Sequence, residues 1–475
     1  MAVAVGLDVG TTAVKAIAVS ETGEVLASSE EEHPLATPRP GWAEQDPEDW
    51  WRATERALAR LDAGEVAGIG LSGQMHGLVA LDSSDAVIRP AILWNDGRTG
   101  AECVEIEERI GLERLVELTG NRALPGFTAP KLLWMRAHEP EHYARIAHVL
   151  LPKDYVRLRL TGERAQDASD ASGTLLFDVA RRRWSDEVVE ALELERDWLP
   201  HVHESPELAG RTSDGIPVAA GAGDQAAGAL GVGVVRPGPA SVAMGTSGVV
   251  FTGLDAYAHD PVGRVHAFCH AVPGVWHAMG VMLSAAGSLR WLRDAMGAEA
   301  GFGELVEEAR AWEPGVEGLT FLPYLAGERT PHADPDARGA FTGLSLRHDR
   351  GALVRGVLEG VAYGLRDSLD LVAELGQRPA AGRVSGGGAR SELWLQIVAS
   401  VLELPLERVA VEEGAAYGAA LLGGIAGGLW ADAEEAVAAC VRPHGRVEPV
   451  DTWIEPYREG RERFRALYPA LRSAR

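Results

Sequence analysis

Asp224 is the residue whose type and setting point most directly to chemistry. It stands between Gly223 and Gln225 in a Gly- and Ala-rich segment, residues 218–231, where a strand is predicted to end and a close-packed helix to begin. A carboxylate there can accept the proton of a hydroxyl that attacks a phosphoryl group. It can also cap the following helix, because aspartate is a favoured N-cap residue. The spacing alone leaves both roles open, and the two are compatible.

Two glycine–hydroxyl–hydroxyl turns are candidates for binding phosphate. Gly10-Thr11-Thr12 follows an apolar segment at 2–9, and Gly245-Thr246-Ser247 follows a similar one at 241–244. Glycine lets the backbone come close enough for main-chain N–H groups to donate to phosphate. Asp8, just before the first turn, is of the type that Mg²⁺ binds, usually through water. One such turn is ordinary, but two suggest duplicated domains that face a shared ligand.

Three further motifs carry polar groups in loops. Met75-His76 lies in a glycine-bounded loop after a predicted strand at Val66–Leu71, where a histidine can hydrogen-bond a polyol or serve only the loop. The segment 94–98 combines an aromatic, an amide, an acid and a cation, which suits either a sugar site or a salt-bridged turn. Gly386-Gly387-Gly388 can let a flat adenine lie against the backbone, and it is not a Walker motif because no Lys-Ser/Thr follows.

Lysine is rare in this chain, since only Lys15, Lys131 and Lys153 occur. Lys15 lies close to the first phosphate turn, so it is either a point charge for phosphate or a solvated strand residue. The sequence assigns no role to Lys131 or Lys153.

The elements that must position these residues can be read from the pattern of apolar residues and turns. An antiparallel hairpin is predicted from Ala2–Val9 and Ala13–Val19, and Asp46-Pro47 is predicted to open a helix that runs to about Ala59. A second tightly packed helix is predicted to open in the segment 412–420. A length of 475 residues indicates two domains, and the turn-rich segment 235–239 divides them into residues 1–235 and 236–475.

Composition excludes several other classes of protein. A net charge of −24 argues against nucleic acid or an anionic membrane as the main partner. No apolar run is long enough to span a membrane, and the N-terminus lacks the basic region of a signal peptide. Cys103, Cys269 and Cys440 are scattered without metal-like spacing, which favours a reducing, cytoplasmic location.

With these motifs in their order, the chain resembles the FGGY carbohydrate kinases along its whole length. The resemblance rests on blocks at residues 7–12, 74–77, 92–98, 126–134, 151–155, 223–228, 245–248, 321–331 and 386–391. It implies an α/β fold of two actin-like, ribonuclease-H-like domains with a central cleft for ATP and sugar. The sugar is expected mainly on the first domain and ATP mainly on the second.

The resemblance also implies roles for individual residues. It makes Asp224 the catalytic base and a substrate contact, Met75 and His76 the pair that contacts the sugar, and Asp8 an acid near the metal and the γ-phosphate. The expected phosphate loops contain Thr11, Thr12, Gly245 and Thr246, and the expected adenosine loop contains Gly387 and Gly388. The expected cofactors are ATP and Mg²⁺, and a homodimer is compatible with the family.

Within the family, the Gln-Met-His-Gly block at 74–77 favours D-xylulose, phosphorylated on its 5-hydroxyl. Ribulose, another ketose or a polyol is the alternative in the same class. Two other classes share the nucleotide cleft: a sugar-responsive nucleotide-binding protein with little catalysis, and an ATPase of the actin or chaperone type. The first would require a lost base or phosphate turn, and neither is lost here. The second needs no sugar pocket.

Overall fold

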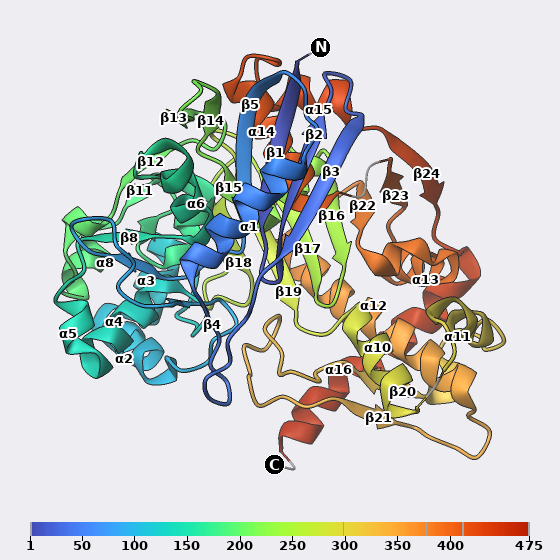
Figure 1. The fold of residues 1–475 in the computed structure, drawn as a ribbon. Helices are drawn as coiled ribbons and strands as arrows, with labels where there is room; N and C mark the ends of the chain where they lie inside the picture. Colours follow the sequence, from blue (N-terminus) through green and yellow to red (C-terminus); the bar gives the residue numbers. More distant parts are fainter. Residues whose placement is uncertain (1, 298, 377, 411–412, 474–475) are drawn as a thin grey trace.

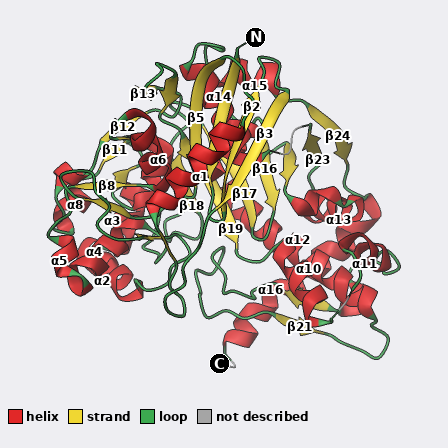
Figure 2. Ribbon diagram, in the orientation of Figure 1, coloured by secondary structure: helices red, strands yellow, loops and turns green. Residues whose placement is uncertain are grey.

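The structure, a computed structural model, describes residues 2–297, 299–376, 378–410 and 413–473. Two large β-sheets with flanking helices dominate it (Figures 1 and 2). The first sheet has the order β13-β14-β5-β1-β2-β3, and β15 also pairs with β5. Its strands are β1 (Val3–Val9), β2 (Ala13–Val19), β3 (Val25–Glu32), β5 (Val66–Gly73), β13 (Leu208–Arg211), β14 (Pro217–Ala219) and β15 (Ala222–Gly223).

The second sheet is formed by the later part of the chain. Its order is β18-β19-β17-β16-β22-β23-β24. Its strands are β16 (Pro239–Met244), β17 (Gly248–Leu254), β18 (His266–Cys269), β19 (Trp276–Met282), β22 (Ala381–Ser385), β23 (Leu406–Val409) and β24 (Pro443–Val447).

The two sheets follow one plan. In the first, β3, β2 and β1 are antiparallel, β5 and β14 continue parallel to β1, and β13 is antiparallel at the edge. In the second, β19, β17, β16, β22, β23 and β24 repeat that sequence of directions. The hairpin β16–β17 thus corresponds to β1–β2, and the two glycine–hydroxyl turns occupy the same place in each sheet. The predicted duplication and the α/β fold are confirmed.

The predicted elements of the first part agree with the structure. The helix α1 (Pro47–Arg60) begins after Asp46, whose side chain accepts from the amide of Glu48 at 3.0 Å. The other helices before residue 232 are α2 (Gly100–Ile110), α3 (Leu112–Thr119), α4 (Thr128–His138), α5 (Pro140–Tyr143), α6 (Pro152–Thr161), α7 (Ala168–Ala171), η1 (Ser172–Thr174), α8 (Asp186–Ala191), η2 (Arg196–Trp198) and α9 (Asp224–Gly231). The short strands are β4 (Glu44–Gln45), β6 (Val79–Leu81), β7 (Ala91–Ile92), β8 (His148–Leu150), β9 (Ala165–Asp167), β10 (Phe177–Asp178), β11 (Arg183–Trp184) and β12 (His201–His203).

The second part adds the long helix α12 and further helices before and after it in the chain. They are α10 (Ala286–Ala295), α11 (Phe302–Ala309), η3 (Val316–Gly318), α12 (Arg350–Glu374), η4 (Gly387–Arg390), α13 (Glu392–Leu402), α14 (Gly414–Ala426), α15 (Ala433–Cys440) and α16 (Asp451–Arg472), with the strand pair β20 (Thr320–Leu322) and β21 (Ala340–Thr342). None of the helices in the described ranges is long and apolar enough to cross a membrane.

Helix α14 packs on the first sheet although it belongs to the second half of the chain (Figure 1). The backbones approach closely through small residues: a Cβ on Gly70 of β5 would lie 1.9 Å from the carbonyl oxygen of Ala419. The segment predicted to open a packed helix is therefore confirmed from Gly414, while its residue 412 lies outside the described residues. A division at residue 235 separates the two sheets along the chain. Helix α14, however, comes from the part after residue 235 and packs on the sheet of the part before it. The boundary itself stays a prediction.

Candidate active site between the two sheets

The first phosphate turn is fixed by hydrogen bonds from three loops. The Oγ1 of Thr11 accepts from the indole N–H of Trp94 at 3.0 Å and donates to Gln74 Oε1 at 3.2 Å. The side-chain amide of Gln45 donates to the carbonyl oxygen of Thr11 at 2.7 Å. The Thr11 hydroxyl is therefore already engaged, and the donors this turn can offer are main-chain N–H groups and the hydroxyl of Thr12. The side chain of Thr12 is exposed.

The second turn is fixed by a helix. The carbonyl oxygen of Gly245 accepts from the amide of Ala286 at 2.8 Å, and that of Thr246 accepts from the amide of Ala285 at 2.8 Å. These amides precede or begin α10, so the turn is seated against the start of that helix. Thr246 matches Thr11 in the order of the motif, but its side chain is exposed, whereas that of Thr11 is half-buried. The two turns are thus held by different supports.

Asp8 and Asp224 line one cavity of about 210 Å³. The opposite wall comes from the second sheet and includes Ser241, Phe251 and Ser385. Both carboxylates are half-buried. Asp8 Oδ1 accepts from the hydroxyl of Ser72 at 2.8 Å. The predicted base and the predicted metal-side acid are therefore neighbours in a cavity bounded by both halves of the molecule.

The surroundings of the cavity raise the pKa of both carboxylates. Burial, with a further contribution from the charge of Asp8, raises the pKa of Asp224 to about 7, against hydrogen bonds from Gln225. Burial also raises the pKa of Asp8, against the Ser72 hydrogen bond and the charge of Lys15. A carboxyl group with a pKa near neutrality is well matched to taking up a proton during turnover.

Asp224 is the first residue of α9, and Gly223 is the N-cap. The alternative reading of Asp224 as the N-cap is therefore wrong by one position. The carboxylate still lies in the first turn, where the helix dipole favours its ionised form.

Met75 and His76 are buried, and Met75 packs against Gly223, the residue before Asp224. His76 has a positive φ of 69°, and its Nδ1 lies 2.6 Å from the carbonyl oxygen of Gly173. A carbonyl only accepts, so Nδ1 carries the proton and Nε2 is an acceptor. Burial lowers the pKa of His76 to about 3, with the charges of Lys131 and Arg329 acting in the same direction and the Gly173 carbonyl against them. His76 is thus a neutral ring that can accept a hydrogen bond from a hydroxyl.

The three lysines have distinct partners. Lys131 is fully buried and donates to the carbonyl oxygens of His76 at 2.8 Å and Gly126 at 2.7 Å, which fixes the loop that presents His76. Lys15 forms an ion pair with Glu413, at the start of α14. Lys153 is fully buried in a cluster of carboxylates.

The sequence leaves the segment 94–98 as either a sugar site or a salt-bridged turn, and the structure shows a salt-bridged turn. Arg98 Nη2 pairs with Asp96 Oδ2 at 2.6 Å, and the guanidinium lies 3.6 Å from the centre of the Trp42 ring. Asp96 also accepts from the amide of Ala43 at 2.7 Å. The acid and the cation of this segment are therefore occupied by each other, and Trp94 serves the first phosphate turn.

The loop of Gly387 and Gly388 opens on a larger cavity of about 630 Å³. The cavity lies between α10, α11 and α13, with Ala286, Phe302 and Trp394 among its lining residues. A Cβ on Gly387 would meet nothing within 4 Å, whereas one on Gly388 would lie 2.9 Å from Met244 Cβ. Ala286 lines this cavity, and its amide also holds the second phosphate turn, so the turn is anchored at the edge of the cavity.

Sequence reasoning missed two features near Met75 and His76. The segment 168–174 contacts both His76 and Gly223, and its buried small residues give no motif to notice. Arg329, from the second half, brings Nη2 within 3.8 Å of where a Cβ on Gly126 would stand. In the sequence, the block at 321–331 that contains Arg329 carries only the family resemblance. A signal was available in the pairing of an acid and a base, Glu328-Arg329, within an otherwise apolar stretch.

Two duplicated actin-like halves, each with a glycine–hydroxyl turn, and a carboxylate pair between them define an ATP-dependent phosphotransferase of the sugar-kinase class. The chain belongs to the FGGY family of carbohydrate kinases. The N-terminal domain of that family matches residues 3–231, and its C-terminal domain matches residues 240–427.

Individual relatives agree along nearly the full length. The chain is 44% identical to the xylulose kinase of Escherichia coli (strain K12), over 98% of this chain and 99% of that one. A crystal structure of a "xyloylose kinase" from Brucella ovis matches with a TM-score of 0.94 and 41% identity over 100% of both chains. The xylulose kinase from Rhodospirillum rubrum matches with a TM-score of 0.92 and 33% identity over 99% of both chains.

Proposed function

We propose that this carbohydrate kinase transfers the γ-phosphoryl group of ATP to the 5-hydroxyl of D-xylulose, with Asp224 as the base. The observation that carries the proposal is the single cavity in which Asp8 and Asp224 face the second sheet. The substrate is supported by the full-length likeness to proteins named xylulose kinase. Met75 and His76, beside Asp224, supply an apolar contact and a hydrogen-bond acceptor for the sugar.

The residues divide the work of the reaction. Asp224 accepts the proton of the attacking hydroxyl as the phosphoryl group arrives. Main-chain N–H groups of the turns at Thr11–Thr12 and Gly245–Thr246 donate to the phosphate oxygens, since the Thr11 hydroxyl is engaged elsewhere. The cavity beside Gly387 and Gly388 has room for the adenosine group.

Asp8 is the residue we propose for the magnesium ion of MgATP. Its Oδ1 is held by Ser72, and its carboxylate faces the same cavity as Asp224. In the described part of the chain, no cluster of three or more His, Cys, Asp or Glu residues could hold a metal ion. A site with Asp8 as its carboxylate fits Mg²⁺, because this ion keeps several waters and uses one or two carboxylates together with substrate phosphates. When bound, the ion neutralises charge on the phosphates.

The test is a substrate panel with the purified protein, ATP and Mg²⁺. We expect D-xylulose to give the highest kcat/KM and a product phosphorylated on O5, compared with D-ribulose, xylitol and glycerol. A higher kcat/KM for another member of the panel would contradict the substrate assignment. ATP consumption that does not rise on adding any of these compounds would contradict sugar kinase activity itself.

A cytoplasmic location and a homodimer belong to the same proposal. The three cysteines are free and buried, as expected in a reducing compartment. Light scattering of the purified protein would give the oligomeric state, and a monomeric mass at micromolar concentration would contradict the dimer.

A further inference from the structure

One short segment contacts both the catalytic base region and the sugar-contact histidine. In α7 and η1, Ser169 Oγ accepts from the amide of Gly223 at 3.2 Å, and the carbonyl oxygen of Gly173 lies 2.6 Å from His76 Nδ1. Gly223 is the residue directly before Asp224. Residues 169 and 173 are about one helical turn apart, so a single turn of chain sets the spacing between base and histidine.

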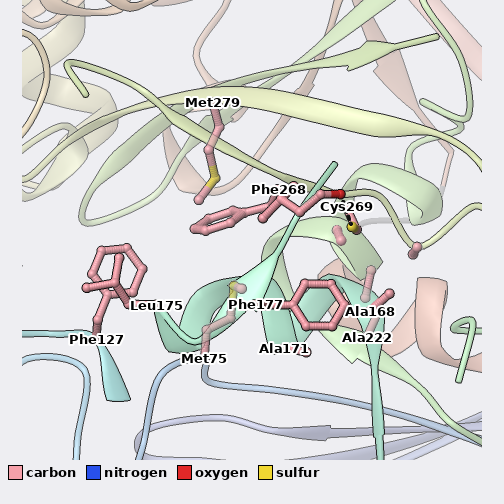
Figure 3. Packing of buried hydrophobic residues seen from close by; sticks show 14 of the residues in the cluster. Met75, Phe127, Ala168, Ala171, Leu175, Phe177, Ala222, Phe268, Cys269 and Met279 are labelled. Atoms are coloured by element: carbon pink, nitrogen blue, oxygen red, sulfur yellow. Dashed lines mark hydrogen bonds between the residues drawn. The ribbon is translucent and has the colours of Figure 1, made fainter. Parts of the chain in front are cut away.

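Side-chain packing also connects the segment 169–173 to the residue before Asp224. A Cβ on Gly223 would lie 2.8 Å from Met75 Sδ, and one on Gly173 would lie 3.0 Å from Met75 Cε. Figure 3 shows Met75 and Ala171 of α7 within one buried hydrophobic cluster. Because Met75 is packed against both glycines, a shift of the segment 169–173 cannot leave the site unchanged.

A buried ionic cluster holds this segment. Asp167, the N-cap of α7, accepts at Oδ1 from the amide of Ser169 at 2.9 Å and from its hydroxyl at 2.5 Å. Asp167 Oδ2 lies 2.7 Å from Lys153 Nζ, which also pairs with Asp154 at 2.6 Å and Asp170 at 3.2 Å. The Lys153 and aspartate side chains are completely buried.

The cluster also reaches the other side of the base. Arg157 Nη1 pairs with Asp154 at 2.8 Å and donates to the carbonyl oxygen of Ala220 at 2.6 Å, four residues before Asp224. Burial raises the pKa of Asp170 well above its ordinary value, against the charge of Lys153. The cluster therefore holds the chain before Asp224 at two points, at Ala220 through Arg157 and at Gly223 through Ser169.

We propose that Ser169 is a positioning residue for Asp224, and that Lys153 anchors Ser169 through Asp167. The Ser169 hydroxyl connects the cluster to the residue before the base, because it donates to Asp167 and accepts from the amide of Gly223. This proposal rests on the proposed role of Asp224, because Ser169 acts only through that carboxylate.

The experiment compares Ser169→Ala and Ser169→Thr with the wild type. Ser400 provides a matched control, because its buried hydroxyl also accepts from a distant amide, that of Val450 at 2.9 Å, and donates to a carbonyl oxygen. We expect Ser169→Ala to lower kcat about tenfold or more with little change in KM for ATP. Ser169→Thr keeps the hydroxyl and should recover part of that loss. Ser400→Ala should lose comparable thermal stability with wild-type kcat. Lys153→Met leaves buried carboxylates uncompensated and is expected to fold poorly, so the serine variants carry the test.

A double-mutant cycle separates this proposal from the proposed function. Ser169→Ala added to Asp224→Asn should cause no further loss of kcat, because the base through which Ser169 acts is already gone. An equal loss in both backgrounds, or a kcat of Ser169→Ala within twofold of wild type, would overturn the positioning role while leaving Asp224 as the base. Wild-type turnover of Asp224→Asn would instead overturn the base assignment.

Discussion

At the scale of single residues, the environment of Asp224 explains how an ordinary aspartate can serve as a base near neutral pH. Burial in the cavity and the charge of Asp8 raise its pKa, while its place in the first turn of α9 and Gln225 favour the ionised form. Asp224→Asn keeps the shape and removes the proton acceptor. We expect kcat to fall by a factor of about 10² to 10⁴.

The measurement for this variant is steady-state turnover with D-xylulose, together with ATP binding by calorimetry. Asp451→Asn is the control, because Asp451 is also the first residue of a helix, α16, but is exposed. We expect that control to keep full activity and the Asp224 variant to keep ATP affinity. Loss of ATP binding in Asp224→Asn would point to a collapsed site in place of a missing base.

The raised pKa of Asp224 predicts a pH profile. The base must be ionised, so kcat/KM for the sugar should fall about tenfold per pH unit below about 7 and level off above it. Asp8→Asn removes a like charge, so the limb should move to lower pH in whatever activity remains. A limb that stays at the same pH in Asp8→Asn would show that burial alone sets the pKa. Asp49→Asn in α1 serves as the control, because Asp49 is not among the residues that line the cavity.

At the scale of elements, two kinds of glycine contact can be told apart by substitution. Gly418 of α14 faces α9, and a Cβ there would lie 1.8 Å from the carbonyl oxygen of Ala227. We expect Gly418→Ala to destabilise the fold by at least about 2 kcal/mol, because backbone cannot yield as a side chain can. Thermal or urea unfolding would show it. Gly100→Ala in α2, where a Cβ meets nothing within 4 Å, should be neutral or slightly stabilising, and equal effects at the two sites would contradict the close-packing account.

Substitution of Gly387 should affect ligand binding and not stability, which is the opposite of what we expect for Gly418. A Cβ there meets no protein atom within 4 Å but projects from the loop that lines the larger cavity. Gly387→Ala should leave thermal stability unchanged and raise KM for ATP severalfold, with KM for the sugar unaffected. An unchanged KM for ATP would place the adenosine group elsewhere. The unfolding midpoint is measured on the same preparation.

The elements that sequence reasoning located are those with a local signature. The hairpin β1–β2 and its repeat β16–β17 follow from alternating apolar residues and a glycine turn, and α1 follows from Asp46-Pro47. What the sequence did not reveal was set by long-range packing. The return of α14 to the first sheet and the hydrogen bond from Gly223 to Ser169, 54 residues away in the chain, have no local pattern. Likewise, the engagement of the Thr11 hydroxyl depends on Trp94 and Gln74, which come from later loops.

At the scale of the whole molecule, the edge hairpin β18–β19 of the second sheet docks on the first half of the chain. His266 Nδ1 donates to Asn121 Oδ1 at 2.5 Å, the amide of Cys269 donates to Ser172 Oγ at 3.1 Å, and the indole of Trp276 donates to the carbonyl oxygen of Val179 at 2.7 Å. The hairpin therefore ties the second sheet to the segment that carries Ser169 and Gly173. A change that loosens this hairpin should therefore also disturb the active site.

Three buried histidines of this hairpin make the contact sensitive to acid. Burial lowers the pKa of His270 to about 3 and those of His266 and His277 well below the ordinary value. Their folded-state pKa values lie below the unfolded value near 6.5, so the unfolded chain binds more protons below pH 6.5. Their contribution to stability is complete above that pH and is lost as the pH falls, at up to about 1.4 kcal/mol per pH unit for each ring.

His277→Phe isolates this effect, because the His277 ring stacks on Phe251 at 4.1 Å and a phenyl ring can keep that contact. Buried acids with a raised pKa, such as Glu328 at about 8, have the opposite pH dependence, but the variant retains them, so they cancel in the comparison. We expect the unfolding free energy of His277→Phe to decline less steeply than that of wild type between pH 6.5 and 5, by up to about 1.4 kcal/mol per pH unit. His444→Phe, on the exposed part of β24, should keep the wild-type slope. If the unfolding free energies of wild type and His277→Phe fell in parallel with pH, His277 would already take up a proton in the folded hairpin. Low pH would then destabilise the protein through other groups.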